Sequence, residues 1–371
     1  MLEPIFYTRA APLRPVRVSM PGIQTKPVLC ALVLLLSAAF LPAVGQESAS
    51  PLPLFASETP LALTIEGPFR TLSRNRRDRE ELPGTVRYED ESGSTVTLDV
   101  QIRTRGNSRM EYCSFPPLRL NFRRRQTEGT VFTGQNELKL ATLCKETSGY
   151  PDYLALEHEV YELFNLLTDR SFRVRWVDIE YIDTDDRNRK TKQRPGFLIE
   201  HRSELAARND LQRWRVDSLQ LEQLEPEQTA LLSVFEFMIG NTDWAGTDGP
   251  PGDRCCHNVD VFRDHTGLAV LVPYDFDQSG FVNAGYAEPA AELRIRSVQQ
   301  RLYRGYCAYN DALDDAFERF RMAREAIESR LAALSVRDRE RRRVVRYIQD
   351  FYEILDDETA REKAIVAACR R

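Results

Sequence analysis

The chain has 371 residues, of which 42% are hydrophobic and 29% are charged, and this composition is typical of a globular protein and not of a disordered one. Lysine and arginine number 51 against 56 aspartate and glutamate residues, so the formal net charge is −5. This acidic balance argues against general nucleic-acid binding, which usually needs a basic excess. The length suits two lobes or two small domains.

The N-terminal segment, residues 1–45, has the three-part layout of a secretory signal. Residues 20–26 end in a lysine, residues 28–40 form a nearly unbroken apolar run, and residues 43–45 are small, as a cleavage site requires. We favour a signal over a membrane anchor because the apolar run is short for a membrane span. We therefore predict an exported protein, periplasmic or extracellular, without a membrane span after signal cleavage.

Export makes disulfides the expected state of the six cysteines that follow this segment. Cys113 and Cys144 flank a run that is typical of consecutive strands, so we favour that pair, and we expect Cys255 or Cys256 to pair with Cys307. A zinc site is the competing explanation. The sequence disfavours zinc, because it contains no C-x-x-C motif and only four histidines.

The rest of the chain divides into a linker at 46–60, a β-rich part at 61–200 and a mostly helical part at 201–371. Alternating or β-branched runs predict the strands of the β-rich part, at 61–65, 95–102, 138–140, 174–182 and 196–200. A single amphipathic helix is predicted at 152–168, and a polar loop at 183–194.

In the last part, Pro226 begins a predicted helix that ends at residue 239. A loop of small and polar residues follows, and then two short strands at 259–262 and 268–272. Residues 290–371 are predicted to be helical. No phosphate-binding glycine loop, dinucleotide-binding motif, H-E-x-x-H motif or G-x-S-x-G motif is present in the sequence.

A cluster of oxygen-bearing side chains lies at the ends of these elements. Asp243 follows the predicted helix, Asn258 precedes the first short strand, and Asp275 follows the second. Each residue alone is typical of a turn, but their order on a helix, loop and hairpin can bring all three together. Carboxylate and amide oxygens suit Mg²⁺ or Mn²⁺ better than zinc. In phosphoryl transfer, Asp243 would accept the proton of the attacking hydroxyl, and Asn258 and Asp275 would hold the metal.

The order of an Asp, a His-Asn pair and an Asp-Phe-Asp motif resembles the secreted atypical kinases of the spore-coat CotH type and, more distantly, HipA-like kinases. The segments at 102–109 (IRTRGNSR) and 196–200 (GFLIE) are also similar to that family, and the resemblance spans about residues 95–285. It implies an α+β, two-lobed atypical protein-kinase-like fold, with a β-rich N-terminal lobe that contains one helix and a mostly helical C-terminal lobe.

The resemblance also implies ATP with Mg²⁺ or Mn²⁺ as cofactors and transfer of a phosphoryl group to a hydroxyl of a protein or cell-envelope component. Asp243 matches the catalytic Asp of the family, and Asn258 and Asp275 match its metal-binding residues. Its basic strand residue corresponds to Asn121 here, so another cation has to contact the nucleotide.

Two cations are candidates for that contact. Lys139, on a predicted strand, can pair with Glu157 on the following helix, as the strand lysine and helix glutamate of kinases do. Arg105 is the other candidate, because arginine binds phosphates through two N–H groups. Two further functions stay open: a catalytically inactive kinase-like envelope or interaction protein, and a metal-dependent enzyme that acts on sugar nucleotides through the D-x-D motif at 275–277.

Overall fold

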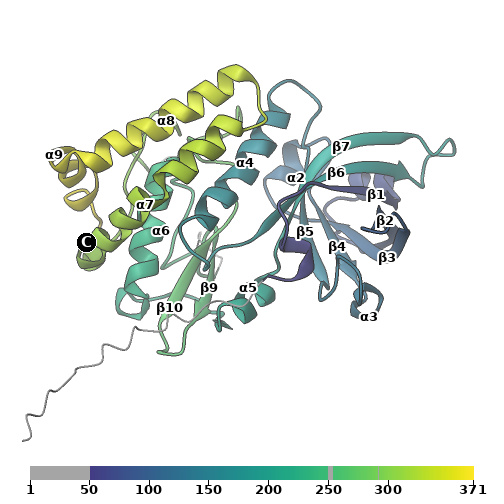
Figure 1. Ribbon diagram of the computed structural model, residues 1–371, viewed down its shortest axis with the longest axis horizontal. Coiled ribbons are helices and arrows are strands. Elements are labelled where there is room, and N and C mark those ends of the chain that lie inside the picture. The colour runs from purple at the N-terminus through teal and green to yellow at the C-terminus, as the bar shows by residue number, and fades with distance from the viewer. Residues whose placement is uncertain (1–50, 250–253, 291) are drawn as a thin grey trace, which may run out of the picture. The chain divides into compact units, whose positions relative to one another are not determined.

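The computed structural model describes residues 51–249, 254–290 and 292–371, so the predicted signal segment lies outside the described residues. The described residues belong to one structural unit, in which a β-barrel is followed by a mostly helical C-terminal region (Figure 1). Within these residues, no helix combines the length and the apolar character needed to cross a membrane.

Seven strands close into the barrel in the order β1-β2-β3-β4-β5-β7-β6. Neighbouring strands are antiparallel except β1 and β6, which run parallel with Leu61 opposite Val177. Alternate residues point inward, and side chains such as Ile65, Ile102 and Leu120 form a buried core inside the barrel. The strands are β1 (Leu61–Gly67), β2 (Leu82–Glu89), β3 (Thr95–Thr104), β4 (Leu118–Phe122), β5 (Glu137–Thr142), β6 (Val174–Asp183) and β7 (Thr191–Ile199).

This closed barrel corrects the predicted two-lobed, kinase-like fold, which is wrong because the N-terminal lobe of a kinase is built on an open sheet. The parallel pairing of β1 with β6 joins segments that are far apart in the sequence. Strand patterns show which residues are extended, but they do not show which strand each one pairs with.

Two local predictions also change. The residues at 191–194, predicted as part of a polar loop, belong to β7, because Thr191 pairs with Ile182 of β6 and continues the hairpin. The hairpin of β6 and β7 extends outward past the other strands (Figure 1). In the predicted linker, Leu54 and Phe55 are buried against the barrel core, and residues Pro53–Phe55 form a 3₁₀-helix, η1.

Helices α4 and α6 confirm the helices predicted at 152–168 and 226–239, but residues 292–306 are not helical. Both helices belong to a second hydrophobic core, where the rings of Phe164 and Phe235 lie 4.5 Å apart. The β-hairpin of β9 and β10 packs in the same core. Along the chain, the helices between β1 and β8 are α1 (Phe69–Arg74), α2 (Arg109–Tyr112), α3 (Arg124–Thr127), α4 (Tyr150–Asn165) and α5 (Arg202–Arg208).

The C-terminal region continues with β8 (Gln212–Arg213), η2 (Leu221–Gln223), α6 (Pro226–Ile239), β9 (Val259–Arg263), β10 (Ala269–Pro273), η3 (Cys307–Ala312), α7 (Leu313–Ala333), α8 (Asp338–Asp356), α9 (Glu358–Arg361) and η4 (Glu362–Val366). Helix α8 shows why this region is helical: its buried residues recur every three or four positions, from Val344 to Leu355, and face the core.

Three disulfides join in pairs the six cysteines that lie in the described part of the chain. The predicted pair Cys113–Cys144 is confirmed. The expected bond to Cys307 from Cys255 or Cys256 is wrong, because Cys255 bonds to Cys256 and Cys307 bonds to Cys369. The last pairing brings η3 together with the C-terminal end of the chain, which sequence spacing does not indicate.

Candidate functional site

The loop that carries Asp243 begins where α6 ends at Gly240, whose φ of 64° is left-handed. The sharp turn needs a glycine for two reasons: glycine adopts a left-handed φ readily, and a side chain here would collide with the hydroxyl of Tyr347. The next turn is held by Asn241, whose side-chain oxygen accepts a hydrogen bond from the backbone N–H of Asp243 at 3.0 Å. Trp244 is buried immediately afterwards, which leaves Asp243 at the surface with 39% of its side chain exposed.

Asp243 and Asn258, predicted as site residues from separate segments, are in direct contact. The amide nitrogen of Asn258 donates to the carboxylate of Asp243 at 2.9 Å and to its backbone carbonyl at 2.7 Å. Backbone hydrogen bonds between Ala245 and His257 hold the two segments side by side. The two loops therefore form one rigid arrangement around the Asp243 carboxylate.

His257, the histidine of the His-Asn pair, belongs to the site although the sequence analysis gave it no role. Its Nε2 lies 2.8 Å from the second carboxylate oxygen of Asp243. The hydrogen bond to Asp243 raises the pKa of His257, since the carboxylate stabilises the protonated ring. Its position directly before Asn258 was the only available sequence signal.

Asp275 follows β10, and two backbone hydrogen bonds fix the chain at residues 274 and 275. The N–H of Tyr274 donates to the carbonyl of Asn258 at 2.9 Å, and the N–H of Asp275 donates to the hydroxyl of Tyr161, from α4, also at 2.9 Å. The side chain of Asp275 is 40% exposed. This arrangement brings the third predicted residue to the loops of Asp243 and Asn258, and its charge contributes to the raised pKa of His257.

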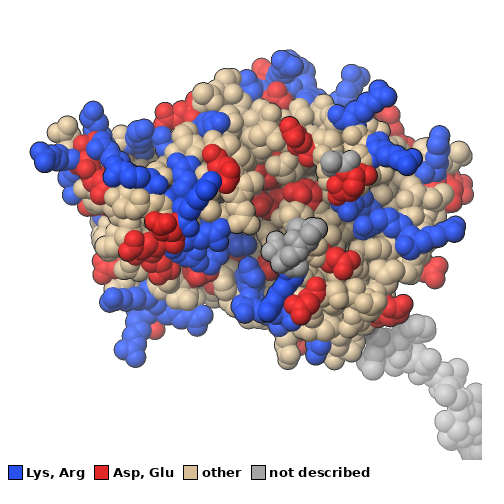
Figure 2. Space-filling view, turned by 180° about the vertical axis from the view of Figure 1, so that it is seen from behind, with Lys and Arg blue, Asp and Glu red and all other residues tan. Residues whose placement is uncertain are grey.

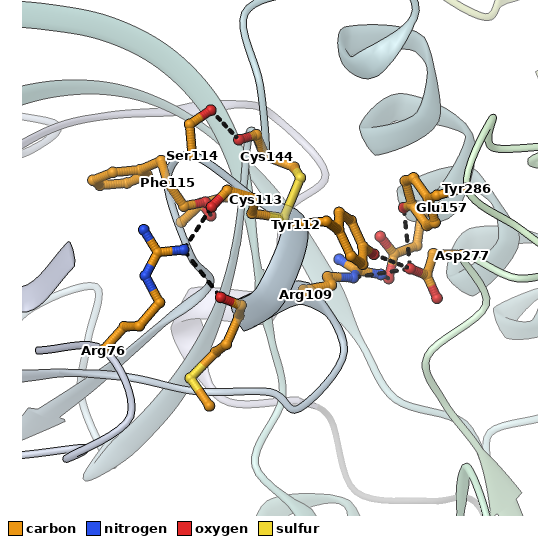
Figure 3. Close-up of a disulfide and its surroundings, with 12 residues drawn as sticks. Arg76, Arg109, Tyr112, Cys113, Ser114, Phe115, Cys144, Glu157, Asp277 and Tyr286 are labelled. Carbon is orange, nitrogen blue, oxygen red and sulfur yellow. Dashed lines mark hydrogen bonds and ion pairs between the residues drawn. A yellow bond between two sulfur atoms is a disulfide. The ribbon is translucent and has the colours of Figure 1, made fainter. Parts of the chain in front are cut away.

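Arg109, on α2, is the second residue that the sequence analysis missed. Its guanidinium lies 2.7 Å from Glu157, 3.2 Å from Asp275 and 3.0 Å from Asp277. Asp277 also accepts a hydrogen bond from the hydroxyl of Tyr286 at 3.0 Å. Burial raises the pKa values of Glu157 and Asp277, although Arg109 opposes both shifts. Figure 3 shows Arg109, Glu157, Asp277 and Tyr286 converging from different elements.

Helix α2 is only four residues long and is held from outside. Cys113, directly after it, is bonded to Cys144 beyond the end of β5. Arg76 donates to the carbonyls of Met110 and Cys113 at 3.0 Å and 2.7 Å on the opposite side of the disulfide from Arg109 (Figure 3). These contacts satisfy carbonyls that so short a helix leaves unpaired and fix the direction in which Arg109 points.

The two predicted cations, Lys139 and Arg105, come from the barrel. Partial burial lowers the pKa of Lys139 to about 8, and its ammonium lies 4.5 Å from the ring centre of Tyr274. Burial also lowers the pKa of Arg105. Negative charge opposes both shifts: the charge of Asp260 and, less strongly, that of Asp275 raise the pKa of Lys139, and the charge of Asp275 raises the pKa of Arg105.

Within residues 51–249, 254–290 and 292–371, neither cation has an ion pair or a side-chain hydrogen bond to the protein. The predicted pair of Lys139 with Glu157 is not formed, because Glu157 lies against Arg109 instead. Two cations without a carboxylate partner among the described residues can bind a phosphate group.

The described residues contain no cluster of three or more His, Cys, Asp or Glu side chains arranged to hold a metal ion. A metal here would rest on Asp275 and on the amide oxygen of Asn258, whose amide nitrogen is the atom bonded to Asp243. This small donor set fits Mg²⁺, which proteins usually hold with one or two carboxylates together with substrate phosphates.

No protein-family model and no curated protein matches the chain. The geometry of this site is therefore the basis on which a function can be proposed.

Proposed function

We propose that the chain is an exported phosphotransferase that depends on Mg²⁺ or Mn²⁺ and transfers a phosphoryl group from ATP to a hydroxyl of a protein or cell-envelope component. The observation that carries the proposal is the position of Lys139, whose ammonium lies 4.5 Å from the ring centre of Tyr274, directly before Asp275, together with the buried cation Arg105, neither of which has an ion pair among the described residues. Export is supported by the three disulfides, which are typical of oxidising compartments.

The contacts of each residue suggest its part in the reaction. Lys139 and Arg105 bind phosphate oxygens, because in the described part of the chain neither has a carboxylate partner to release first. Asp275 and Asn258 would hold Mg²⁺ or Mn²⁺, which supplies positive charge to the phosphates when bound.

Asp243 is the proton acceptor, and its contacts with His257 and Asn258 fix the direction of its carboxylate. The acceptor oxygen bonds to the γ-phosphorus as its proton passes to Asp243. The bond from that phosphorus to the β–γ bridging oxygen breaks, and ADP leaves.

A non-catalytic protein that binds nucleotide or an envelope partner is the second candidate. One observation favours it: Arg109 already contacts Asp275 at 3.2 Å and competes for the carboxylate that a metal would need. We give less weight to an enzyme that acts on sugar nucleotides, because Asp277, the second Asp of its D-x-D motif, is buried and bonded to Arg109 and Tyr286.

The test uses the purified chain with ATP and Mn²⁺ or Mg²⁺. We expect ATP with the metal to raise the melting temperature and ADP to be released. Asp275→Asn removes the charge that would hold the metal and should abolish both effects. Asp243→Asn should keep the thermal shift and slow ADP release by about a hundredfold or more, as loss of a general base does.

Asp315→Asn is the matched control, because Asp315 is an exposed carboxylate on α7. It should behave as the unaltered protein. A thermal shift without ADP release or phosphoryl transfer would support the non-catalytic candidate, and the absence of any shift with either metal would contradict both nucleotide-binding functions.

A further inference from the structure

A pocket with a volume of about 360 Å³ lies at the barrel, beside α1 and the hairpin of β6 and β7. Three aromatic side chains line it: Phe69, Phe115 and Tyr181. Each ring meets the other two edge to face or nearly so, with ring centres between 5.0 and 5.8 Å apart. The rings form a rigid apolar wall, to which a flat or cyclic molecule can bind.

The other wall of the pocket is basic, because alternate side chains of β7 point to the same face of the strand. Lys192 and Arg194 are two residues apart on β7, so their side chains share one face, and Lys190 lies just before the strand. Because Tyr181 is paired with Lys192 across the hairpin, that face is also the one on which Tyr181 lies. All three cations line the pocket.

The cations of this pocket outnumber its carboxylates. Arg70 is the fourth cation, and it is neutralised by Asp183 at 3.3 Å and Asp186 at 2.8 Å. The carboxylate oxygens of Asp183 also accept hydrogen bonds from the backbone N–H groups of Phe69 and residue 185. The two carboxylates are therefore occupied within the protein.

Arg194 is bonded to Glu146 and lies over the ring of Phe115, with 4.9 Å between the guanidinium carbon and the ring centre. Lys192 reaches Glu146 only at 4.0 Å, and both side chains are more than half exposed. Lys190 has no ion pair with any residue in the described part of the chain. The positive charge of the two lysines is thus left for a ligand.

Tyr181 provides an observation that is independent of charge. Its side chain is 4% exposed, and its hydroxyl has no hydrogen-bond partner among the described residues. A buried hydroxyl without a partner is unfavourable, so such groups usually bind a ligand or an ordered water.

The charge on the surface seen in Figure 2 is mixed and is not predominantly basic. Figure 2 shows lysine and arginine interspersed with aspartate and glutamate over the face seen there, as the net charge of −5 also suggests. Binding of an anion by this protein would have to come from a local arrangement of cations rather than from a general basic field.

We propose that this pocket binds a small organic anion, with a flat or cyclic apolar body against the aromatic wall and a phosphate, sulfate or carboxylate group between Lys190 and Lys192. The site is separate from that of Asp243 and Asp275, with which it shares no lining residue. It goes beyond the proposed phosphotransferase function and does not depend on it.

Calorimetric titration of the full chain with 1-naphthyl phosphate tests the proposal. We expect saturable binding of one molecule, with inorganic phosphate and 1-naphthol each bound at least about tenfold more weakly, because each supplies half of the contacts. No saturable binding, or equal binding of inorganic phosphate alone, would overturn the proposal.

Variants locate the ligand. The exposed double variant Lys190→Gln/Lys192→Gln should reduce the affinity by about tenfold or more, since it removes both free charges. Lys363→Gln, an exposed lysine on η4, is the matched control and should leave the affinity unchanged. Lys139→Gln should also leave it unchanged, and loss of binding in that variant would place the probe in the other site and overturn the assignment.

Tyr181→Phe examines the buried hydroxyl. The variant loses no hydrogen bond to any residue that the structure describes, so we expect its melting temperature to stay the same or rise. Its affinity for 1-naphthyl phosphate should fall by about fivefold, which corresponds to the loss of one hydrogen bond. Unchanged affinity would show that the hydroxyl does not contact the ligand and would contradict its part in the proposal.

Discussion

The guanidinium of Arg109 lies 2.7 Å from the carboxylate of Glu157, and this contact joins α2, at the edge of the barrel, to α4 in the second hydrophobic core. Both side chains are almost completely buried, with 11% and 5% exposed. Because the same guanidinium also contacts Asp275 and Asp277, one buried cation organises three carboxylates. The stability of the fold and the shape of the site therefore depend on the same residue.

Replacing Arg109 with methionine should destabilise the protein strongly. The substitution leaves Glu157 and Asp277 buried without a counter-charge, which typically costs about 3–5 kcal/mol. Chemical unfolding measures the effect. The matched control is Arg77→Met, which breaks an exposed pair with Glu111 and should cost less than about 1 kcal/mol. Equal losses in the two variants would contradict the central position of Arg109.

The stability of the protein should depend on the protonation of Glu236. Burial raises the pKa of this α6 carboxyl from 4.5 to about 8. The folded state therefore binds the proton more tightly than the unfolded state. The contribution of protonated Glu236 to the free energy of unfolding is complete below pH 4.5 and is lost as the pH rises to about 8.

Glu236→Gln should therefore make the decrease of melting temperature between pH 5 and 8 less steep. The control is Glu325→Gln, at an exposed position on α7. Parallel curves for Glu236→Gln and the unaltered protein would show that Glu236 is ionised in the folded state.

The pair of Asp243 and His257 can be tested without any substrate. Since the hydrogen bond to Asp243 raises the pKa of His257, Asp243→Asn should lower that pKa toward its ordinary value near 6.5. Titration of the ring signals by NMR measures this change. Asp315→Asn should leave the His257 titration unchanged, and an equal shift in both variants would argue against the contact.

Binding of ATP should weaken as the pH rises through the pKa of Lys139, which burial lowers to about 8. The protonated ammonium attracts phosphate and the neutral amine does not, so the dissociation constant should increase between pH 7 and 9. Lys139→Arg keeps the charge over this range and should give a flat profile. A Lys139→Arg profile as steep as that of the unaltered protein would assign the pH dependence to another group.

Much of the local structure could be predicted from residue patterns. The apolar positions of α4 and α6 recur at helical spacing, and the Pro226 and Gly240 positions mark the two ends of α6. The Cys113–Cys144 bond followed from the strands between the two cysteines. For the two helices the responsible interactions are formed by neighbours in the sequence, and the disulfide joins residues that are 31 positions apart.

Long-range pairings escaped the same reasoning. Arg109 looked like one arginine among many, and only the packing of α2 against α4 brings it to Glu157 in place of Lys139. The bond between Cys307 and Cys369 depends in the same way on how the helices of the C-terminal region fold back on one another.

The sequence by itself determined where helices α4 and α6 and the strands β9 and β10 lie, and that Asp243, Asn258 and Asp275 stand at the ends of those elements. Only the tertiary structure decided that β1 pairs with β6 to close a barrel, and that Arg109 forms the ion pair with Glu157 that was expected of Lys139. It also decided that Tyr181 and Lys192 line the same pocket. The physical reason is that backbone preferences act between near neighbours. Strand pairing and the burial of charge instead depend on which distant segments meet, and a single sequence does not record this.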